Sequence, residues 1–514
     1  MLISTCEPGT REVVLQSIRH WVVSKISSGV YSISGMAGLG KSTIVKTIAE
    51  WAVHPNHDHD GFFLATFFFS RREGAELRTA SHVIPTLVYQ LAKQHLGFRA
   101  RVIELLDEDP DWVDSSLPKQ AEIFATALEV LRGLETTPLV ILDAFDECSL
   151  PGSVALLSLL LSLAFPQDRN VDPLPLKILV TSRPEAKLVS TFTNYCRREE
   201  YVLHDMDKAI GRGDIRHYLE QSMLRVPERF IPTLEPPLSS SWFTVADVEA
   251  LTDRAGTFFI YAATAMRIIE DDNVREPELQ LRSLLTIQST DSLQYGALDN
   301  LYMSVIENIL PKDCTNPDAV VRRYKEVVGT LVLLRDALPL KAVSSLLDIE
   351  LQQISSALVP LHSLVTNPSD PDGSPTFYHA SFYDFITSKR CKNVKLRLVL
   401  EEQERYLATR CLEILTRELR RNLGGIENPT ASISKLGNIR KRISPEIRYS
   451  TCYWGLHLEK SVKYDANLIS LINDFGSRCL AWWIELCGLL GRLDLAAECA
   501  QKAAVWMVRR IRAT

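Results

Sequence analysis

The 514-residue chain lacks a hydrophobic run long enough to cross a bilayer, and it lacks cysteine pairs of the C-x-x-C type. Its longest apolar run, residues 153–165, is shorter than the roughly 20 residues that a transmembrane helix needs, and it predicts a buried helix instead. Ten scattered cysteines are typical of a reducing compartment and argue against a zinc module. The N-terminus has no basic stretch followed by an apolar one, so no secretory signal is predicted. We therefore expect a cytoplasmic protein without a membrane span.

The sequence also lacks an excess of positive charge. Its formal net charge is −6, and a balance this mild favours neither nucleic acid nor an anionic membrane surface as a partner. Residues 342–388 contain no lysine or arginine, so a DNA-reading module in that stretch would have no phosphate anchor. An apolar content of 46% and a charged content of 23% are those of an ordinary globular protein. We predict no nucleic-acid partner.

The first part of the chain alternates short apolar runs with helical patterns. Helices are expected near residues 10–24, 81–95 and 119–131. Strands are expected at residues 30–34, 62–70, 139–143 and 176–185. This alternation predicts a mostly parallel sheet with helices on both faces, an α/β domain over residues 1–204.

After about residue 204 the pattern changes to consecutive helices, which predicts a helical domain over residues 205–310. Two short helices, at residues 340–347 and 351–361, precede a strand, a tight "NPSDPDGSP" turn and the returning strand "TFYHASF". That order predicts a winged helix within residues 311–392. The remainder, residues 393–514, is helical by pattern. The chain length itself suggests about three or four domains.

The stretch "SGMAGLGKST" contains Gly35-x-x-x-x-Gly40-Lys41-Ser42, which matches the P-loop pattern in full. A predicted strand precedes it and a predicted helix follows it, as this motif requires. Glycines such as Gly38 let backbone N–H groups close around phosphate oxygens, and the helix N-terminus adds partial positive charge. We expect Lys41 to reach the β- and γ-phosphates, the hydroxyl of Ser42 to bind Mg²⁺, and Thr43 to lie against the phosphates.

The stretch "LVILDAFDEC" places three carboxylates at the end of a buried strand, where unpaired charge is costly. Asp143 ends the strand and is predicted to hold Mg²⁺ through water, the Walker B role. Asp146 or Glu147 would orient or activate the attacking water, and the sequence leaves that choice open. Alternatively, one of these three acids has only a structural role and caps the next helix.

Arg183, in "VTSRPE", follows the next predicted strand. A guanidinium at this position can contact the γ-phosphate and so report on its presence. The alternative is an ordinary surface arginine after a core strand.

Taken together, these motifs resemble the NACHT class of STAND ATPases. The resemblance rests on the P-loop, on "LDAFDE" with a small residue after its first acid, and on "TSRPE". Further matches follow in order along the chain: "EPGTR" at residues 7–11, "FFFSRREG" at 67–74, "RAGTFFIYAATA" at 254–265, "LVLLRDALPLKAVSSLL" at 331–347 and "HASFYDFI" at 379–386. In detail the series is most similar to fungal NACHT proteins. The resemblance covers roughly residues 6–510.

The resemblance implies a nucleotide switch in which ADP holds the domains closed and ATP opens them for self-association, with slow hydrolysis. It implies that His379 contacts the β-phosphate of ADP and that Thr10 and Arg11 lie near the base and ribose. It also implies a role in fungal self/non-self recognition or regulated cell death. Many relatives carry a Gly-x-Pro in the helical domain, where this chain reads "GTF" at residues 256–258.

Other functions stay open at this stage. A scaffold that binds nucleotide without turnover is one, and a metabolic P-loop kinase is another. The chain starts almost at the P-loop domain and ends at Thr514 in helices, so we expect either that the gene is truncated or that partner proteins supply effector or sensor domains.

Overall fold

The computed structural model forms two compact units, residues Met1–Leu298 and Asp299–Thr514. It describes residues 4–24, 29–53, 62–70, 76–134, 137–149, 152–165, 173–195, 201–206, 211–230, 238, 241–272, 274–287, 296–310, 315–366, 368, 370–426, 439–461 and 465–511. Residues 71–74 of the "FFFSRREG" motif lie outside this part of the chain. The finer division into four domains stays a prediction.

The first unit is built on a five-stranded parallel sheet in the order β2-β3-β4-β1-β5. The predicted parallel sheet is confirmed. The strands are β1 Val30–Ser34, β2 Leu64–Phe68, β3 Leu139–Asp143, β4 Lys177–Ser182 and β5 Tyr201–Asp205. Four of them were expected from their apolar runs, whereas β5 is an edge strand with mixed polarity that the pattern did not predict.

The pairing register brings the carboxyl ends of three strands to one edge of the sheet. Ser34 at the end of β1 pairs with Ser182 at the end of β4, and Leu142 of β3 pairs with Val180 of β4. Strand β4 therefore lies between the strand that precedes the P-loop and the strand that ends in Asp143. In parallel α/β sheets this edge is where ligands bind.

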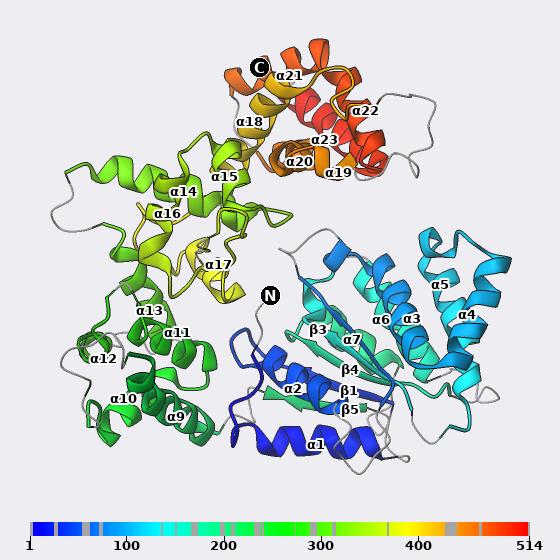
Figure 1. Ribbon diagram of the computed structural model, residues 1–514, viewed down its shortest axis with the longest axis vertical. Coiled ribbons are helices and arrows are strands. Elements are labelled where there is room, and N and C mark those ends of the chain that lie inside the picture. The colour runs from blue at the N-terminus through cyan, green and yellow to red at the C-terminus, as the bar shows by residue number, and fades with distance from the viewer. Residues whose placement is uncertain are drawn as a thin grey trace. The chain divides into compact units, whose positions relative to one another are not determined.

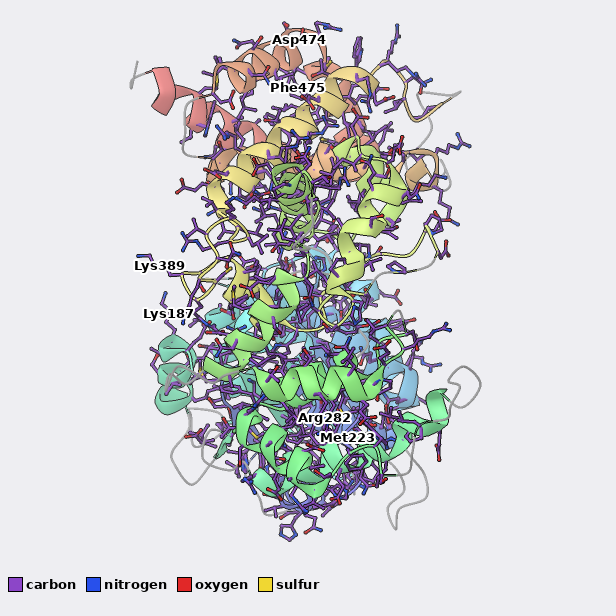
Figure 2. The ribbon with its side chains drawn as sticks, turned by 90° about the vertical axis from the view of Figure 1, so that its left-hand side faces the viewer. Lys187, Met223, Arg282, Lys389, Asp474 and Phe475 are labelled. Atoms are coloured by element: carbon purple, nitrogen blue, oxygen red, sulfur yellow. The ribbon has the colours of Figure 1, made fainter. Side chains whose placement is uncertain are left out.

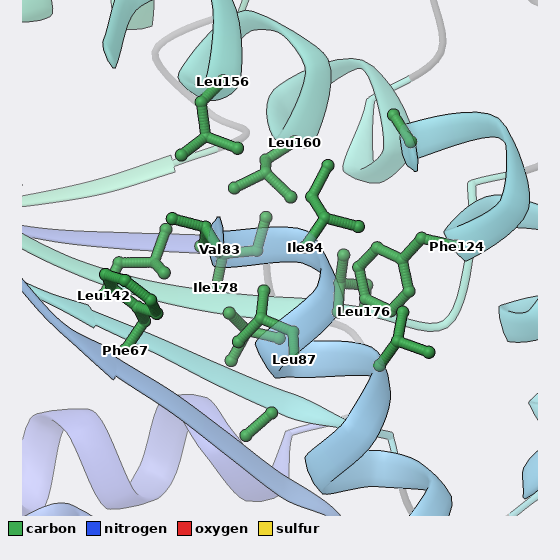
Figure 3. Close-up of a cluster of buried hydrophobic side chains, with 14 of the residues drawn as sticks. Phe67, Val83, Ile84, Leu87, Phe124, Leu142, Leu156, Leu160, Leu176 and Ile178 are labelled. Atoms are coloured by element: carbon green, nitrogen blue, oxygen red, sulfur yellow. The ribbon is translucent and has the colours of Figure 1, made fainter. Parts of the chain in front are cut away.

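Helices cover both faces of the sheet (Figure 1). Helices α1 and α2 lie on one side and α3 and α6 on the other, where a continuous cluster of buried side chains joins the sheet to α3, α5 and α6 (Figure 3). Figure 3 shows this cluster with sheet residues Phe67, Leu142 and Ile178 beside Ile84, Leu87, Phe124 and Leu160 of the helices. The helices of this part are α1 Glu12–Val23, α2 Lys41–Val53, α3 Val83–Gln94, α4 Leu96–Glu108, α5 Leu117–Leu128, α6 Gly152–Ala164 and α7 Ala186–Tyr195.

In the described part of the chain, the outer edge of β2 pairs with two glutamine side chains and not with a further strand. Gln90 accepts a hydrogen bond from the backbone N–H of Thr66 at 2.7 Å and donates to the carbonyl of Thr66 at 3.0 Å. One helical turn later, Gln94 makes the same two contacts with Leu64, at 2.9 and 2.7 Å. Helix α3 thus satisfies donors and acceptors that an edge strand otherwise exposes for pairing with another chain.

We expect Gln90→Ala to lower the free energy of unfolding by about 1–2 kcal/mol, because both backbone groups of Thr66 lose their partner. Denaturant unfolding of the full chain measures this change. Gln16→Ala is the matched control, since Gln16 is an exposed glutamine inside α1 of the same unit. A loss no larger for Gln90→Ala than for Gln16→Ala would show that the pairing contributes nothing to stability.

After β5, the described residues of the first unit form helices and the turns between them. A capping box between Thr244 and Asp247 starts α10, and Gly256, with φ +57°, ends it before α11 begins. Figure 2 labels Met223 on α9 and Arg282 on α12. Met223 is fully buried, and Arg282 forms an ion pair with Asp247 at 2.7 Å. These helices are α9 Arg212–Phe230, α10 Val245–Ala255, α11 Phe259–Ile269, α12 Pro277–Thr286 and α13 Gly296–Glu307, the last of which reaches into the second unit.

After α14, the second unit contains a helix-turn-helix arrangement. The two predicted short helices are confirmed as α15 and α16, and a 3₁₀ turn, η6, extends the second to Leu361. The expected hairpin is reduced to one antiparallel bridge between Val365 and Phe377, and the expected returning strand gives way to helix α17. The elements are α14 Pro317–Leu333, α15 Leu340–Leu347, α16 Leu351–Leu358, η6 Val359–Leu361 and α17 Ala380–Ile386.

Helices α18 to α23 complete this unit. Figure 2 labels the neighbours Asp474 and Phe475 of α21. Phe475 is buried against Trp454 and Trp483, whereas Asp474 pairs with Arg478. The helices are α18 Leu400–Glu418, α19 Ile439–Arg442, α20 Pro445–Lys460, α21 Ala466–Arg478, α22 Leu480–Leu489 and α23 Leu493–Ile511. None of the helices in the described part of the chain has both the length and the apolar character that a membrane span requires.

Candidate functional site

The predicted P-loop forms the turn between β1 and α2. At Gly35 a Cβ atom would lie 2.8 Å from side-chain atoms of both Leu39 and Met206, so the loop closes only on glycine. Gly40 has φ +89°, a left-handed conformation that glycine adopts without strain. Gly35 therefore allows the loop to pack closely against Leu39 and Met206, and Gly40 allows the backbone turn; a phosphate-binding loop needs both.

Lys41 is the first residue of α2, and its ammonium group lies against the loop. It donates to the carbonyl of Gly35 at 2.6 Å and to that of Met36 at 2.8 Å. Ser42 and Thr43 follow in the first turn of the helix, where the backbone N–H groups have no partner within the helix. A helix N-terminus beside a lysine is suited to an anion.

Asp143 ends β3 and is buried, with 2% of its surface exposed. Thr181 of β4 donates its hydroxyl proton to Asp143 Oδ1 at 2.5 Å. Burial raises the pKa of Asp143, and the hydrogen bonds from Thr181 and Ser42, together with the charge of Lys41, act in the opposite direction. The structure thus brings Lys41, Ser42 and Asp143 together, although 100 residues separate the aspartate from the P-loop in the sequence.

The two oxygen groups predicted to serve Mg²⁺ fit that ion. The hydroxyl of Ser42 and the carboxylate of Asp143 are within hydrogen-bond reach of each other, and hard oxygen donors are the ligands that Mg²⁺ prefers. Because Mg²⁺ usually keeps several waters and takes one or two protein ligands beside phosphate oxygens, these two groups are sufficient for a P-loop site.

Asp146 and Arg183 form a second pair beside the first. Asp146 Oδ1 accepts the backbone N–H of Arg183 at 3.0 Å, and Asp146 Oδ2 lies 3.3 Å from Arg183 Nε. The Asp146 side chain is 6% exposed and that of Arg183 is 31% exposed. Glu147, the last residue of the short 3₁₀ turn Phe145–Glu147, is half-buried.

Thr181 is a site residue that the sequence analysis missed. Its hydroxyl donates to Asp143 and accepts the backbone N–H of Ala144 at 2.9 Å, and this contact supports the left-handed conformation of Ala144, with φ +52°. Strand β4 and the residue that follows it thus provide a partner for each acid. Thr181 contacts Asp143, and Arg183 contacts Asp146. The sequence did hold a signal for Thr181. It lies two residues before Arg183, so both residues were expected at the carboxyl end of the same predicted strand.

Arg11 also lies at the P-loop. It is buried and has φ +60°, and its guanidinium donates to the carbonyl of Leu39 at 2.7 Å. The same group lies 4.5 Å from the ring centre of Phe259 on α11 and 3.9 Å from Asp214 on α9. Burial lowers the pKa of Arg11, and Asp214 partly offsets this. The side chain therefore joins the P-loop to the helical part of the same unit.

The segment around Arg11, residues 6–11, continues this connection, and we call it the N-terminal strap. Glu7 forms two hydrogen bonds with Arg225 of α9, at 2.7 and 3.0 Å, and the carbonyl of Pro8 lies 3.0 Å from His217 Nε2. Thr10 is buried and donates to the carbonyl of Glu7 at 2.7 Å. The strap therefore connects α9 to the P-loop of the candidate nucleotide site.

A direct contact between the P-loop and α11 adds to the strap. The backbone N–H of Ile260 donates to the carbonyl of Gly38 at 3.1 Å. Ile260 lies just after the "GTF" stretch at residues 256–258, so this part of the helical segment approaches the P-loop.

His379 belongs to the second unit, where it caps the N-terminus of α17. Its Nδ1 accepts the backbone N–H of Ser381 at 3.0 Å, and the hydroxyl of Tyr302 lies 2.7 Å from that of Ser381. Since Nδ1 is an acceptor, the proton of the neutral ring resides on Nε2, which makes Nε2 a donor. The contact of His379 with a phosphate stays a prediction.

Comparison with known proteins adds a partial match. Residues 9–183 match the family model described as Nephrocystin 3, N-terminal, a stretch that runs from Gly9 to Arg183 and so includes every candidate residue of the first unit. This is less than half of the chain. No curated protein matches the chain in sequence.

Among solved structures, the chain is similar to a Signal Transduction ATPase with Numerous Domains (STAND) protein with a tetratricopeptide repeat sensor from Pyrococcus horikoshii. The identity is 14% and the TM-score 0.43, over 100% of this chain and 66% of that one. It is also similar to the ORC1 protein of Aeropyrum pernix, solved in complex with DNA, with 11% identity, a TM-score of 0.34 and coverage of 75% and 93%. For Cdc6p from Pyrobaculum aerophilum the identity is 12%, the TM-score 0.31 and the coverage 79% and 95%. At these values the similarities establish no function.

Proposed function

We propose that this chain binds ATP and ADP with Mg²⁺ at the P-loop and acts as a nucleotide-controlled switch with slow hydrolysis. The observation that carries the proposal is the cluster of Lys41, Ser42 and Asp143 at the carboxyl edge of the sheet. A lysine beside a glycine loop, a helix N-terminus and two oxygen donors for a divalent cation are the parts that a nucleoside polyphosphate requires.

In this proposal each candidate residue has a distinct role. The loop glycines Gly35, Gly38 and Gly40, with Thr43, surround the phosphates, and Lys41 contacts the β- and γ-phosphates. Ser42 and Asp143 hold Mg²⁺, which when bound neutralises charge on the phosphate oxygens. Arg183 contacts the γ-phosphate, His379 the β-phosphate of ADP, and Thr10 and Arg11 lie near the base and ribose.

A switch needs more than one contact that differs between its states. Moving an equilibrium from 1:99 to 99:1 takes about 5.5 kcal/mol of differential binding. One charged hydrogen bond, such as that from His379 to a phosphate, contributes roughly 1.5–3 kcal/mol. Within the first unit, Arg11 and the backbone pair Gly38–Ile260 offer a physical route by which a change at the P-loop reaches α9 and α11.

The wider architecture supports a switch of the NACHT/STAND type in preference to a metabolic kinase. The chain continues past the α/β part into helical segments and a helix-turn-helix with a short hairpin, which we interpret as a winged helix. A kinase has no evident use for these segments. We further propose that ATP promotes self-association and that partner proteins supply effector or sensor functions.

Two measurements on the purified full chain test the proposal. We expect ADP to co-purify with the protein, and we expect a non-hydrolysable ATP analogue with Mg²⁺ to increase its oligomeric state, as measured by light scattering. Bound nucleotide with no change in oligomeric state would favour a static scaffold, and fast turnover stimulated by a metabolite would favour a kinase. Failure to bind any adenine or guanine nucleotide with Mg²⁺ present would refute the proposal.

A further inference from the structure

We propose that Arg11 is a positioning residue for phosphate binding, which holds the peptide between Leu39 and Gly40 so that the N–H group of Gly40 faces the phosphates. The inference rests on the proposed function and deepens it. Arg11 lies near the base and ribose in that function, but we assign its contribution to the P-loop backbone. That contribution is therefore equal for any polyphosphate, with or without a nucleoside.

The guanidinium of Arg11 acts on a single peptide of the P-loop, because it donates to the carbonyl of Leu39 at 2.7 Å. The carbonyl and the N–H of a trans peptide lie in one plane and point in opposite directions, so the N–H of Gly40 points away from Arg11. Gly38 and Gly40 both have φ +89°, whereas Leu39 between them has a negative φ. Such alternation turns successive N–H groups toward one side, which is the geometry of an anion-binding nest.

The preceding peptide of the loop is held in the same way. The backbone N–H of Ile260, in the first turn of α11, donates to the carbonyl of Gly38 at 3.1 Å, so the N–H of Leu39 points away from α11. Among the described residues, the N–H groups of Leu39 and Gly40 have no hydrogen-bond acceptor. Two consecutive donors without a protein partner, beside carbonyls that are already bonded, are suited to phosphate oxygens.

The surroundings of Arg11 keep its guanidinium at the loop. Its backbone has φ +60°, a conformation that a residue other than glycine adopts at a cost, where it forms the N-cap of α1. The guanidinium lies 4.5 Å from the ring centre of Phe259 and 3.9 Å from Asp214, and the side chain is 5% exposed. Burial of a charge is costly, and these two contacts offset part of that cost. The enclosed guanidinium is therefore better placed to support the loop than to move toward a ligand.

Calorimetric titration of the full chain with pyrophosphate, with ADP and with a non-hydrolysable ATP analogue, each with Mg²⁺, tests this assignment. Arg11→Met removes the donor and its charge but keeps a long side chain against Phe259. Asp214 is 26% exposed, so its charge stays in contact with water in this variant. We expect the affinity to fall about tenfold, the value of one charged hydrogen bond, and by the same factor for all three ligands.

Arg11→Lys keeps a charged donor and is expected to restore part of the lost affinity, again equally for the three ligands. Thermal unfolding verifies that each variant is folded. Should Arg11→Met not fold, the equality of the losses is measured on Arg11→Lys alone, because the same reasoning applies to it.

Arg225→Ala is the matched control. Arg225 of α9 bonds to Glu7 of the strap at 2.7 and 3.0 Å and its side chain is 54% exposed, so its replacement loosens the strap without removing a contact to the P-loop. We expect the affinities of this variant to stay within about twofold of wild type, since an exposed ion pair contributes little.

Four results would overturn the inference. A loss for ADP and the ATP analogue with unchanged pyrophosphate binding would show that Arg11 contacts the nucleoside. An equal loss in Arg225→Ala would assign the effect to the strap as a whole. A loss in Arg11→Met that disappears in high salt would show that Arg11 attracts anions by its charge alone, because salt screens such an attraction. Equal binding of all three ligands by the wild type and by Arg11→Met would refute the inference and leave the proposed function intact, whereas a wild-type chain that binds none of them refutes both.

Discussion

Replacing Lys41 by alanine is expected to reduce the affinity of the full chain for ATP by about 10²- to 10⁴-fold, and its affinity for ADP, which lacks the γ-phosphate, by about 10- to 100-fold. Two phosphate contacts from one ammonium group correspond to roughly 3–6 kcal/mol at 1.5–3 kcal/mol each, and every 1.4 kcal/mol is tenfold. The ammonium is already beside the loop, where it donates to the carbonyls of Gly35 and Met36. On binding nucleotide, the ammonium would exchange these carbonyl contacts for charge-assisted hydrogen bonds to phosphate oxygens. Titration with a fluorescent nucleotide in the presence of Mg²⁺ measures the change.

Lys46→Ala provides the matched control for this result. Lys46 lies on the same helix, α2, and forms an exposed ion pair with Glu50 at 3.7 Å. Such surface pairs contribute at most about 1 kcal/mol to stability, so this variant should fold and bind nucleotide normally. Equal affinities for Lys41→Ala and Lys46→Ala would mean that the P-loop does not hold the phosphates.

Replacing Gly455 by alanine is expected to lower the free energy of unfolding of the second unit by about 1–3 kcal/mol or more, the usual range for overpacking. Helices α20 and α23 cross so closely that a Cβ atom on Gly455 would lie 2.7 Å from both the Cα and the carbonyl oxygen of Cys499. These are backbone atoms, which cannot rotate away as a flexible side chain can. The two helices must separate, and contacts such as the one from Cys499 Sγ to the carbonyl of Cys452 at 3.2 Å weaken with them.

Gly476→Ala is the control, because it makes the same change in the helix α21 with open space around it. A Cβ atom at Gly476 meets no heavy atom within 4 Å, and alanine is the better helix former by about 1 kcal/mol. We expect this variant to be neutral or slightly stabilised. Hydrogen exchange measured by mass spectrometry should rise in α20 and α23 of Gly455→Ala and stay unchanged in Gly476→Ala. Similar stability of the two variants would contradict the close crossing.

The elements predicted best were those with a local signal. Strand β1 was predicted with the bounds that the structure gives it, because "VYSIS" is an apolar run that ends at a glycine-rich turn. Strand β5 and helix α4 were missed. β5 lies at the edge of the sheet, where Val202 and Leu203 are exposed and the last two residues of the strand are polar. Helix α4 follows α3 after a single residue, His95, which caps α4 with its own side chain. Strand β5 therefore carries no apolar run, whereas α4 does have a helical pattern, buried Phe98, Val102 and Leu105 at four- and three-residue spacing, which the prediction did not use.

The residues of the candidate site likewise fall into those that a local motif identifies and those that only the fold brings together. Gly35, Gly40, Lys41 and Ser42 are contiguous, so their motif identifies them without knowledge of the fold. The contacts of Asp146 with Arg183, and of Thr181 with Asp143, join residues 37 and 38 positions apart. Nothing in the local sequence specifies which acid faces which partner, because that depends on the register between β3 and β4.

The sequence by itself determined that a glycine loop, a lysine and a buried acid exist, and that their flanking strands are parallel. Those properties follow from residue type and spacing, since backbone freedom, charge and hydrophobic periodicity are local. Only the tertiary structure decided that β4 lies between the P-loop strand and the acid-bearing strand, and that the strap residue Arg11 joins Leu39 to Phe259. The physical reason is that strand order, register and side-chain contacts between distant segments are set by packing of the whole unit, to which every buried residue contributes.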